Sequence, residues 1–132
     1  MVCFDTTFMI DLLRQNPAAE KKLNSLIKGD DGPCMTVITV GELFYGAYKS
    51  KNVEKEKEKT KEALSGFLIL EMNERGAEKF GEILSTLDQK GQKINDRDVM
   101  IAAIAMSKGE YRMVTRNKKD FERIPNLTVE TY

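Results

Sequence analysis

The sequence predicts an α/β fold, a three-layer α/β/α sandwich in which a mainly parallel sheet of four or five strands lies between helices. Two observations predict it. Short apolar runs rich in β-branched residues alternate along the chain with segments whose apolar residues recur at helical spacing, and short turns join them, as in parallel βαβ units. With 132 residues, of which 41% are hydrophobic, we expect one domain over residues 1–132.

The expected strands are short, and the first of them is expected to be buried. They cover residues 1–4, 34–38, 67–70, 112–115 and 127–130. The first, MVCF, stops at Asp5, and the second, CMTVI, is rich in β-branched residues. The last follows Pro125, which favours a short strand at the edge of the sheet.

The expected helices begin at recognisable capping residues. Asn16 precedes Pro17, a typical helix start, and Asn73 is positioned to cap a long helix that ends near Gly91. Segment 99–106 is apolar all round, so we expect a helix packed on several sides. Segment 50–65 is a highly charged, solvated helix with three Glu/Lys pairs at i,i+3 spacing: Glu54–Lys57, Glu56–Lys59 and Glu58–Lys61.

The composition excludes several classes of function. The 21 basic residues balance the 21 acidic ones, which argues against a protein that coats nucleic acid through bulk charge. The chain has no histidine, so neither a Ser-His-Asp nor a Cys-His site can form. Two cysteines without histidine cannot make a four-ligand zinc site. Any hydrolysis must therefore use carboxylates, a metal-activated water or a cofactor.

The sequence also predicts a cytoplasmic protein that does not enter a membrane. The start of the chain lacks the pattern of a signal peptide, and no apolar run reaches the length of a membrane span. We interpret Cys3 and Cys34 as small core residues in a reducing compartment, and a disulfide between them stays open.

Polar residues that suit metal chemistry follow the predicted strands or begin the helix that leads into one. Asp5 follows the first strand, Glu42 the second and Asn117 the fourth, and Asp98 lies in the first turn of the buried helix. In an open parallel sheet, ligands bind beyond the carboxyl ends of the strands. Each residue also has a purely structural interpretation: Asp5 and Asp98 as helix caps, Glu42 as the partner of Thr39 in a capping box, and Asn117 as a turn residue.

Three clustered carboxylates repel one another and resist ionisation. No single lysine or arginine neighbours all three acids, so a hard divalent cation would compensate their negative charge better. Mg²⁺ uses oxygen ligands, keeps several waters and lowers the pKa of a bound water, which gives hydrolytic chemistry without histidine.

Four sequence blocks resemble the PIN-domain family, and specifically the VapC-type toxins of prokaryotic toxin–antitoxin pairs. The blocks are FDTTFMID (residues 4–11), TVGELFYGA (39–47), DVMIAAIA (98–105) and VTRNKKDFERIP (114–125). Each block alone is weak evidence, but the four occur in order and cover essentially the whole chain.

The resemblance implies a PIN-like three-layer fold and an endoribonuclease that depends on Mg²⁺ or Mn²⁺. It carries Asp5, Glu42 and Asp98 over as catalytic acids, with Asp5 and Asp98 as metal ligands. The fourth position, acidic in many relatives, here resembles Asn117, and this weakens the case for a second tightly held ion. Asp96 is an extra acid that either caps its helix or assists at the metal through water.

The mechanism that we infer is hydrolysis of a phosphodiester bond in RNA. Asp5 and Asp98 hold the ion, and Glu42 orients or deprotonates the attacking water. Thr115, Arg116 and Lys118 follow the same strand end and are candidates for binding the RNA, together with Lys119; ordinary loop charges are the alternative.

The resemblance also implies two protein partners, a second copy of the chain in a homodimer and a VapB-type antitoxin. The apolar side chains of Phe44, Tyr45 and Tyr48 belong either to such a surface or to the core.

Three other functions compete with this interpretation. A receiver-like signalling domain also has a parallel sheet and Mg²⁺, but it needs an aspartate after its third strand, where this chain has Leu70-Glu71-Met72-Asn73. A catalytically inactive PIN-like module that binds RNA or protein is favoured only by Asn117 in place of an acid. Structure-specific DNA cleavage occurs among more distant PIN relatives and fits this chain length less well.

Overall fold

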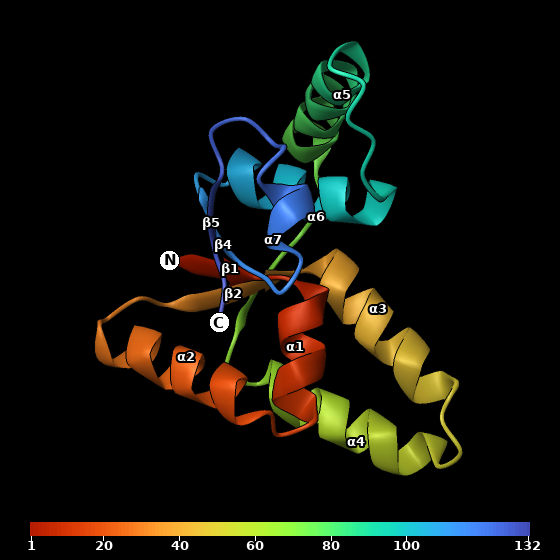
Figure 1. Cartoon of the computed structure of the whole chain (residues 1–132). Coiled ribbons are helices and arrows are strands. Elements are labelled where there is room, and N and C mark those ends of the chain that lie inside the picture. Colours follow the sequence, from red (N-terminus) through yellow and green to blue (C-terminus); the bar gives the residue numbers. More distant parts are fainter.

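The computed structural model describes residues 1–132 and contains a five-stranded sheet whose neighbouring strands are all parallel. The strands are β1 (Val2–Phe4), β2 (Pro33–Thr36), β3 (Leu68–Leu70), β4 (Arg112–Val114) and β5 (Thr128–Glu130). Their order across the sheet is β3-β2-β1-β4-β5, so β5 is an edge strand as predicted (Figure 1). The α/β class is confirmed. A receiver-like fold is excluded because it would place β3, not β4, beside β1.

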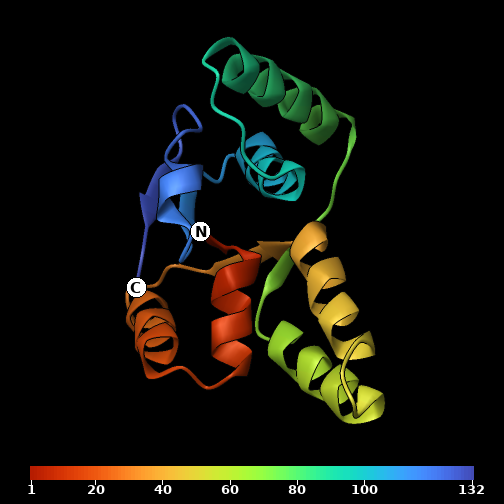
Figure 2. The ribbon, with the colours of Figure 1, turned by 45° about the vertical axis from the view of Figure 1, so that its right-hand side comes forward.

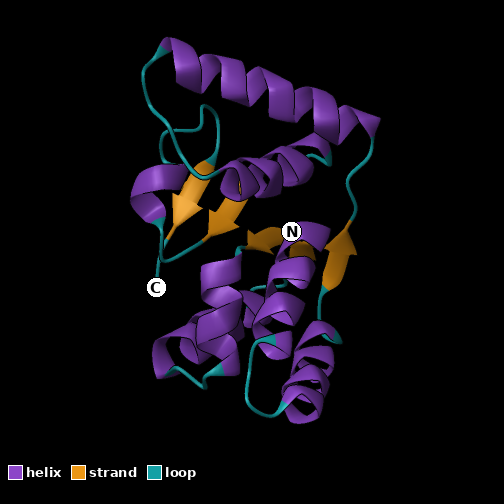
Figure 3. Ribbon diagram, turned by 90° about the vertical axis from the view of Figure 1, so that its right-hand side faces the viewer, coloured by secondary structure: helices purple, strands orange, loops and turns teal.

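Seven helices cover the two faces of this sheet (Figure 3). They are α1 (Thr6–Leu13), α2 (Pro17–Lys28), α3 (Val37–Tyr48), α4 (Val53–Leu64), α5 (Glu74–Gln89), α6 (Asp96–Ser107) and the short α7 (Lys118–Phe121). The predicted caps are confirmed at Asn16 and Asn73, whose side chains accept hydrogen bonds from the first turns of α2 and α5. None of the helices combines the length and the apolar character that a membrane-spanning segment needs.

The strands build two hydrophobic cores because successive side chains point to opposite faces of the sheet. In β1, Val2 and Phe4 join the core on one face, whereas Cys3 joins the core on the other. In β4, Met113 and Val114 divide in the same way. All of these side chains are fully buried, so β1 and β4 lie in the middle layer of the sandwich.

Different helices close the two cores. Helices α5 and α6 cover the core that contains Cys3, and α1, α2 and α3 cover the core that contains Phe4 (Figure 2). In α6 every residue from Ile101 to Met106 is buried, which confirms that the apolar segment is packed on several sides. Helix α4 has the predicted solvated character, and its three i,i+3 ion pairs form with N–O distances of 3.6–3.8 Å.

The structure corrects the boundary between β2 and α3. The second strand ends at Thr36 rather than residue 38, and Val37 begins the helix. The N-cap is Thr36, whose hydroxyl accepts a hydrogen bond from the backbone of Thr39, so the proposed capping box of Thr39 and Glu42 is wrong. Glu42 consequently lies in the second turn of α3, not the first. Packing of the helix against both cores outweighs the strand preference of Val37 and Ile38.

The two cysteines are free and are expected to resist thiol reagents in the folded protein. Cys3 and Cys34 lie opposite each other on β1 and β2, and neither is accessible to solvent. This confirms that they are core residues. Titration with an aromatic disulfide should show almost no reaction in buffer and reaction of both thiols in denaturant, because only unfolding exposes them. Rapid reaction in buffer would contradict the burial.

Candidate active site

The candidate site lies where the strand order of the sheet reverses direction, between β1 and β4. In open α/β sheets, the crevice beyond the carboxyl ends of the strands at this switch point is the usual place for a ligand. Asp5 directly follows β1, and Thr115 and Asn117 follow β4. Helix α6 precedes β4 along the chain and starts at the same edge, which brings Asp98 to the crevice.

Asp5 is almost entirely buried, at 1% exposure, and both of its carboxylate oxygens accept hydrogen bonds. Oδ1 accepts from the Thr7 hydroxyl at 2.8 Å and from the Phe8 backbone at 3.0 Å, and Oδ2 accepts from the Thr115 hydroxyl at 2.5 Å. Asp5 therefore caps α1 and also lies at the candidate site. Burial raises the pKa of Asp5, and the hydrogen bonds from Thr115 and Phe8 oppose that rise.

Glu42 enters the site from α3 with its two oxygens in different environments. Oε1 accepts a hydrogen bond from the Thr6 hydroxyl at 2.7 Å. Oε2 lies 3.6 Å from Nε of Arg97, the second residue of α6. Because Thr6 adjoins Asp5 and Arg97 adjoins Asp98, these contacts connect Glu42 to both of the other predicted acids.

Asp98 is the carboxylate whose charge is most strongly opposed by its surroundings. Its pKa rises from the usual 3.8 to about 6, chiefly because of burial and then because of the negative charges of Asp5 and Glu42. Asn117 partly offsets this rise, since its Nδ2 donates to Asp98 Oδ2 at 3.3 Å. The predicted residues Asp5, Glu42, Asp98 and Asn117 are thus neighbours.

The structure adds one acid that the sequence analysis missed, Asp120. The Nδ2 of Asn117 donates to Asp120 Oδ2 at 3.0 Å as well as to Asp98, so the amide bridges the two carboxylates. The charge of Asp120 also raises the pKa of Asp98. The available signal was the spacing: Asp120 is three residues after Asn117, which places both on one face of a helical turn such as α7.

The residues at the start of α6 have separate roles. The N-cap is Asn95, whose Oδ1 accepts from the Arg97 backbone at 2.8 Å. Asp96 is the first helical residue and is exposed, so its interpretation as the cap is wrong.

The residues predicted to bind substrate differ in accessibility. Thr115 is fully buried; its hydroxyl donates to Asp5 and accepts from the Asn117 backbone at 2.8 Å. The side chains of Arg116 and Lys118 are 59% and 48% exposed. Arg116 and Lys118 are therefore open to a ligand from solvent, as is the exposed Lys119.

The donor set of the site fits a hydrated divalent ion better than a dehydrated one. No three acidic side chains converge closely enough to ligate one ion directly together. Mg²⁺ needs only one or two direct carboxylates and keeps several waters. Two arginines lie near the charges around Asp98, Arg97 beside Glu42 and Arg123 beside Asp120, and neither has an ion pair with Asp98 itself; a bound divalent cation would compensate the remaining charge.

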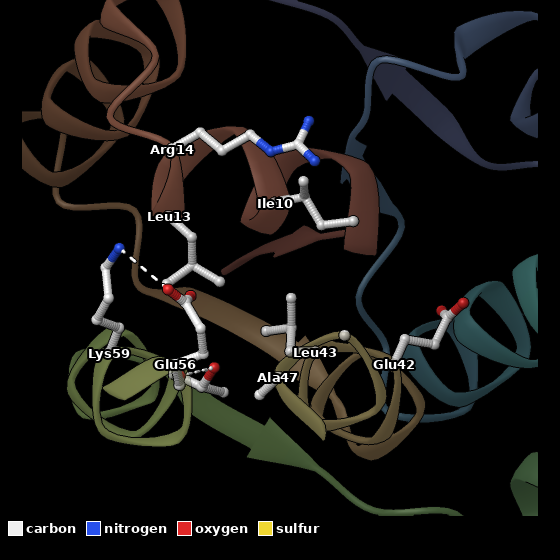
Figure 4. Close-up of a pocket in the computed structure, with 10 residues that line it drawn as sticks. Ile10, Leu13, Arg14, Glu42, Leu43, Ala47, Glu56 and Lys59 are labelled. Carbon is white, nitrogen blue, oxygen red and sulfur yellow. Dashed lines mark hydrogen bonds and ion pairs between the residues drawn. The ribbon is translucent and has the colours of Figure 1, made fainter. Parts of the chain in front are cut away.

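A groove of about 380 Å³ opens next to the site between α1, α3 and α4 (Figure 4). Its apolar lining residues are Ile10, Leu13, Leu43 and Ala47. Glu42 lies at one end, Glu56 and Lys59 lie at the other, and Arg14 lies on the α1 side. The neighbouring Tyr45 and Tyr48 are each 60% exposed on α3, so they lie outside the core, whereas Phe44 is half-buried.

Comparison with known proteins agrees with this architecture. The sequence pattern of the PIN domain matches residues 2–127. Ribonuclease VapC2 of Haemophilus influenzae (strain ATCC 51907 / DSM 11121 / KW20 / Rd) is 33% identical over 128 residues, which are 97% of this chain and 95% of that protein. The tRNA(fMet)-specific endonuclease VapC of Shigella flexneri is 30% identical over the same shares. The crystal structure of VapBC2 from Rickettsia felis, bound to a DNA fragment from their promoter, matches with a TM-score of 0.92 and 30% identity over 100% of this chain and 99% of that one. The chain therefore belongs to the PIN-domain family and is grouped within it with the VapC ribonucleases.

Proposed function

We propose that this protein is a metal-dependent endoribonuclease that hydrolyses RNA phosphodiester bonds and acts as the toxin of a VapBC-type toxin–antitoxin pair. The observation that carries the proposal is that Asp5, Glu42 and Asp98 lie near one another at the switch point of the sheet, close enough for the charges of Asp5 and Glu42 to raise the pKa of Asp98. The VapC relatives are ribonucleases, which supports the same chemistry.

Asp5 and Asp98 hold Mg²⁺, or Mn²⁺, in this proposal. When bound, such an ion lowers the pKa of a coordinated water and neutralises charge on a phosphate. Thr7 and Thr115 fix the Asp5 carboxylate through their hydroxyls, and Asn117 fixes Asp98 through its amide. We assign Asp120 to the same acidic cluster because Asn117 links it to Asp98.

Glu42 orients the attacking water and accepts its proton. Its Oε1 is held by Thr6, and Oε2 faces Arg97 at 3.6 Å, a distance that leaves this oxygen free to accept another hydrogen bond. Arg116 and Lys118 bind the phosphates of the RNA strand, which suits an enzyme with no net charge that holds its substrate locally.

Cleavage of RNA by the purified protein tests this function. Total RNA and transcribed tRNA(fMet) are incubated with the chain in excess EDTA and then with added Mg²⁺ or Mn²⁺. We expect internal cuts that appear only with the added ion. A protein that binds RNA but never cuts it would instead be the inactive PIN-like module, and cleavage of DNA flaps alone would indicate a different nuclease.

The partner that we propose for the groove is the helical or extended segment of a VapB-type antitoxin. The groove has an apolar floor and ends at Glu42, so a segment lying in it would cover the site and inhibit cleavage. The exposed Tyr45 and Tyr48 next to the groove support a further interface, which we assign to a homodimer in the cytoplasm.

Filling the groove should weaken the binding of the antitoxin. Gly46 lines the groove, and a Cβ at this position meets no other atom within 4 Å, so Gly46→Lys should fold normally. We expect at least about tenfold weaker antitoxin binding, because the new side chain occupies the space of the partner. Calorimetric titration with the antitoxin measures the effect.

Gly81→Lys is the matched control for this substitution. Gly81 lies on α5, far along the chain from the groove, is exposed and has equally open space. Its binding of antitoxin should equal that of the unsubstituted protein. Equal binding by the two variants and the parent would reject the groove as the antitoxin site.

A further inference from the structure

We propose that Asp11 and Tyr132 are positioning residues that hold the guanidinium of Arg116 ready to bind a phosphate of the RNA strand. This inference rests on the proposed ribonuclease function and deepens it. The three side chains come from α1, from the segment after β5 and from the segment after β4, and they meet beside the acidic cluster.

Arg116 is connected to the catalytic carboxylates through its backbone. Its N–H donates to the Thr7 hydroxyl at 3.1 Å, and that hydroxyl donates to Asp5 at 2.8 Å. The side chain nevertheless leaves the protein surface at 59% exposure. Arg116 is therefore fixed at its base next to the site, while its charged end is accessible to a ligand.

The charged end of Arg116 is held by a buried carboxylate. Its Nη1 donates to Oδ1 of Asp11 at 3.2 Å, and the Asp11 side chain is only 6% exposed. The other oxygen of Asp11, Oδ2, accepts a hydrogen bond from the Tyr132 hydroxyl. Because each oxygen has its own donor, Asp11 has a defined orientation toward Arg116.

Tyr132 is itself held firmly against α1. Its ring packs edge-on against Phe8, with 5.0 Å between the ring centroids, and its hydroxyl lies 3.4 Å from the carbonyl oxygen of Thr7. Burial and the contact with Asp11 raise the pKa of Tyr132, so the hydroxyl remains a proton donor at neutral pH. The series of hydrogen bonds from Tyr132 through Asp11 to Arg116 thus begins in a packed region and ends in solvent.

This arrangement leaves most of the guanidinium free for a phosphate. Arginine has five N–H donors in a planar fork that matches phosphate oxygens in pairs, and the structure uses one of them on Asp11. A long side chain that is already oriented loses less conformational freedom on binding. Lys118 offers the contrast, since its only ion pair is with Glu122 one turn away on the exposed surface.

RNA affinity measured in the Asp98→Asn background tests the inference without cleavage of the probe. The probe is a fluorescently labelled single-stranded RNA of random sequence, and affinity is followed over a range of salt concentrations. Adding Arg116→Gln should reduce the slope of log K against log salt by about 0.7, the loss of one phosphate contact on a single strand. Adding Tyr132→Phe should weaken binding about 2- to 10-fold by loosening Arg116.

The combination of variants separates positioning from a merely structural role. Tyr132→Phe should have no further effect once Arg116 is glutamine, but it should keep its full effect in a Lys118→Gln background. An equal effect of Tyr132→Phe in both backgrounds, or none with Arg116 present, would overturn the inference. If the unsubstituted protein cuts no RNA with Mg²⁺ or Mn²⁺, the proposed function fails and this inference with it; normal cleavage with additive variants rejects the inference alone.

Discussion

Replacing Asp98 by asparagine should lower the rate of metal-stimulated RNA cleavage by at least about 100-fold while leaving the fold intact. The substitution keeps the size of the side chain and its ability to accept from Asn117, but it removes the negative charge that would hold the cation. The measurement is single-turnover cleavage of RNA at saturating Mg²⁺, with circular dichroism as the check on folding.

Asp96→Asn is the matched control for this experiment. Asp96 is in the same first turn of α6, loses the same charge and is exposed. We expect its cleavage rate to stay within about threefold of the parent, since solvent screens exposed charges. A similar loss in both variants would show that charge at the start of α6 matters in general and would contradict the specific role of Asp98.

The Asp98→Asn substitution should also stabilise the metal-free protein near neutral pH. The folded state raises the pKa of Asp98 from 3.8 to about 6. Between these values the folded state binds more protons than the unfolded state, so stability falls as the pH rises through this window. Asp98→Asn removes the penalty, and we expect a gain of about 1–3 kcal/mol in the free energy of unfolding near neutral pH.

Urea denaturation in EDTA at several pH values measures this effect. The difference between parent and Asp98→Asn should shrink as the pH falls from about 6 to about 4 and should vanish below that, where Asp98 is protonated in both states. It should also shrink when Mg²⁺ is added, because the ion binds the folded parent and offsets the repulsion. If Asp98→Asn is less stable than the parent at neutral pH without metal, this would contradict our interpretation that burial and the neighbouring acids disfavour the ionised Asp98.

Much of the fold follows from the sequence because its strands and caps carry local signals. Residues 2–4 of the first apolar run alternate between the two cores, and the side chains of Asn16 and Asn73 cap their helices as expected. The start of α3 was mispredicted because Val37 and Ile38 favour a strand locally, whereas the helix is stabilised by Ile38 on one core and by Val40 and Leu43 on the other. Tertiary contacts outweigh propensity at such boundaries.

The candidate site was predictable in part. Asp5, Glu42 and Asp98 could be proposed because a parallel sheet brings the ends of its strands to one edge. Asp120 was missed because its spacing from Asn117 is informative only if residues 118–121 are helical, and its place in the cluster depends on the bridging amide of Asn117. The contact of Tyr132 with Asp11 joins residues 121 positions apart and has no local signature.

The location of a bound cation tests the central claim most directly. Crystals of the protein soaked in Mn²⁺ give an anomalous signal that locates the ion independently of its ligands. We predict one ion beside Asp98 and Asp5, bound directly or through water molecules. An ion found only elsewhere on the molecule, or a crevice between β1 and β4 that stays empty at saturating Mn²⁺, would contradict a metal-dependent nuclease site at this position.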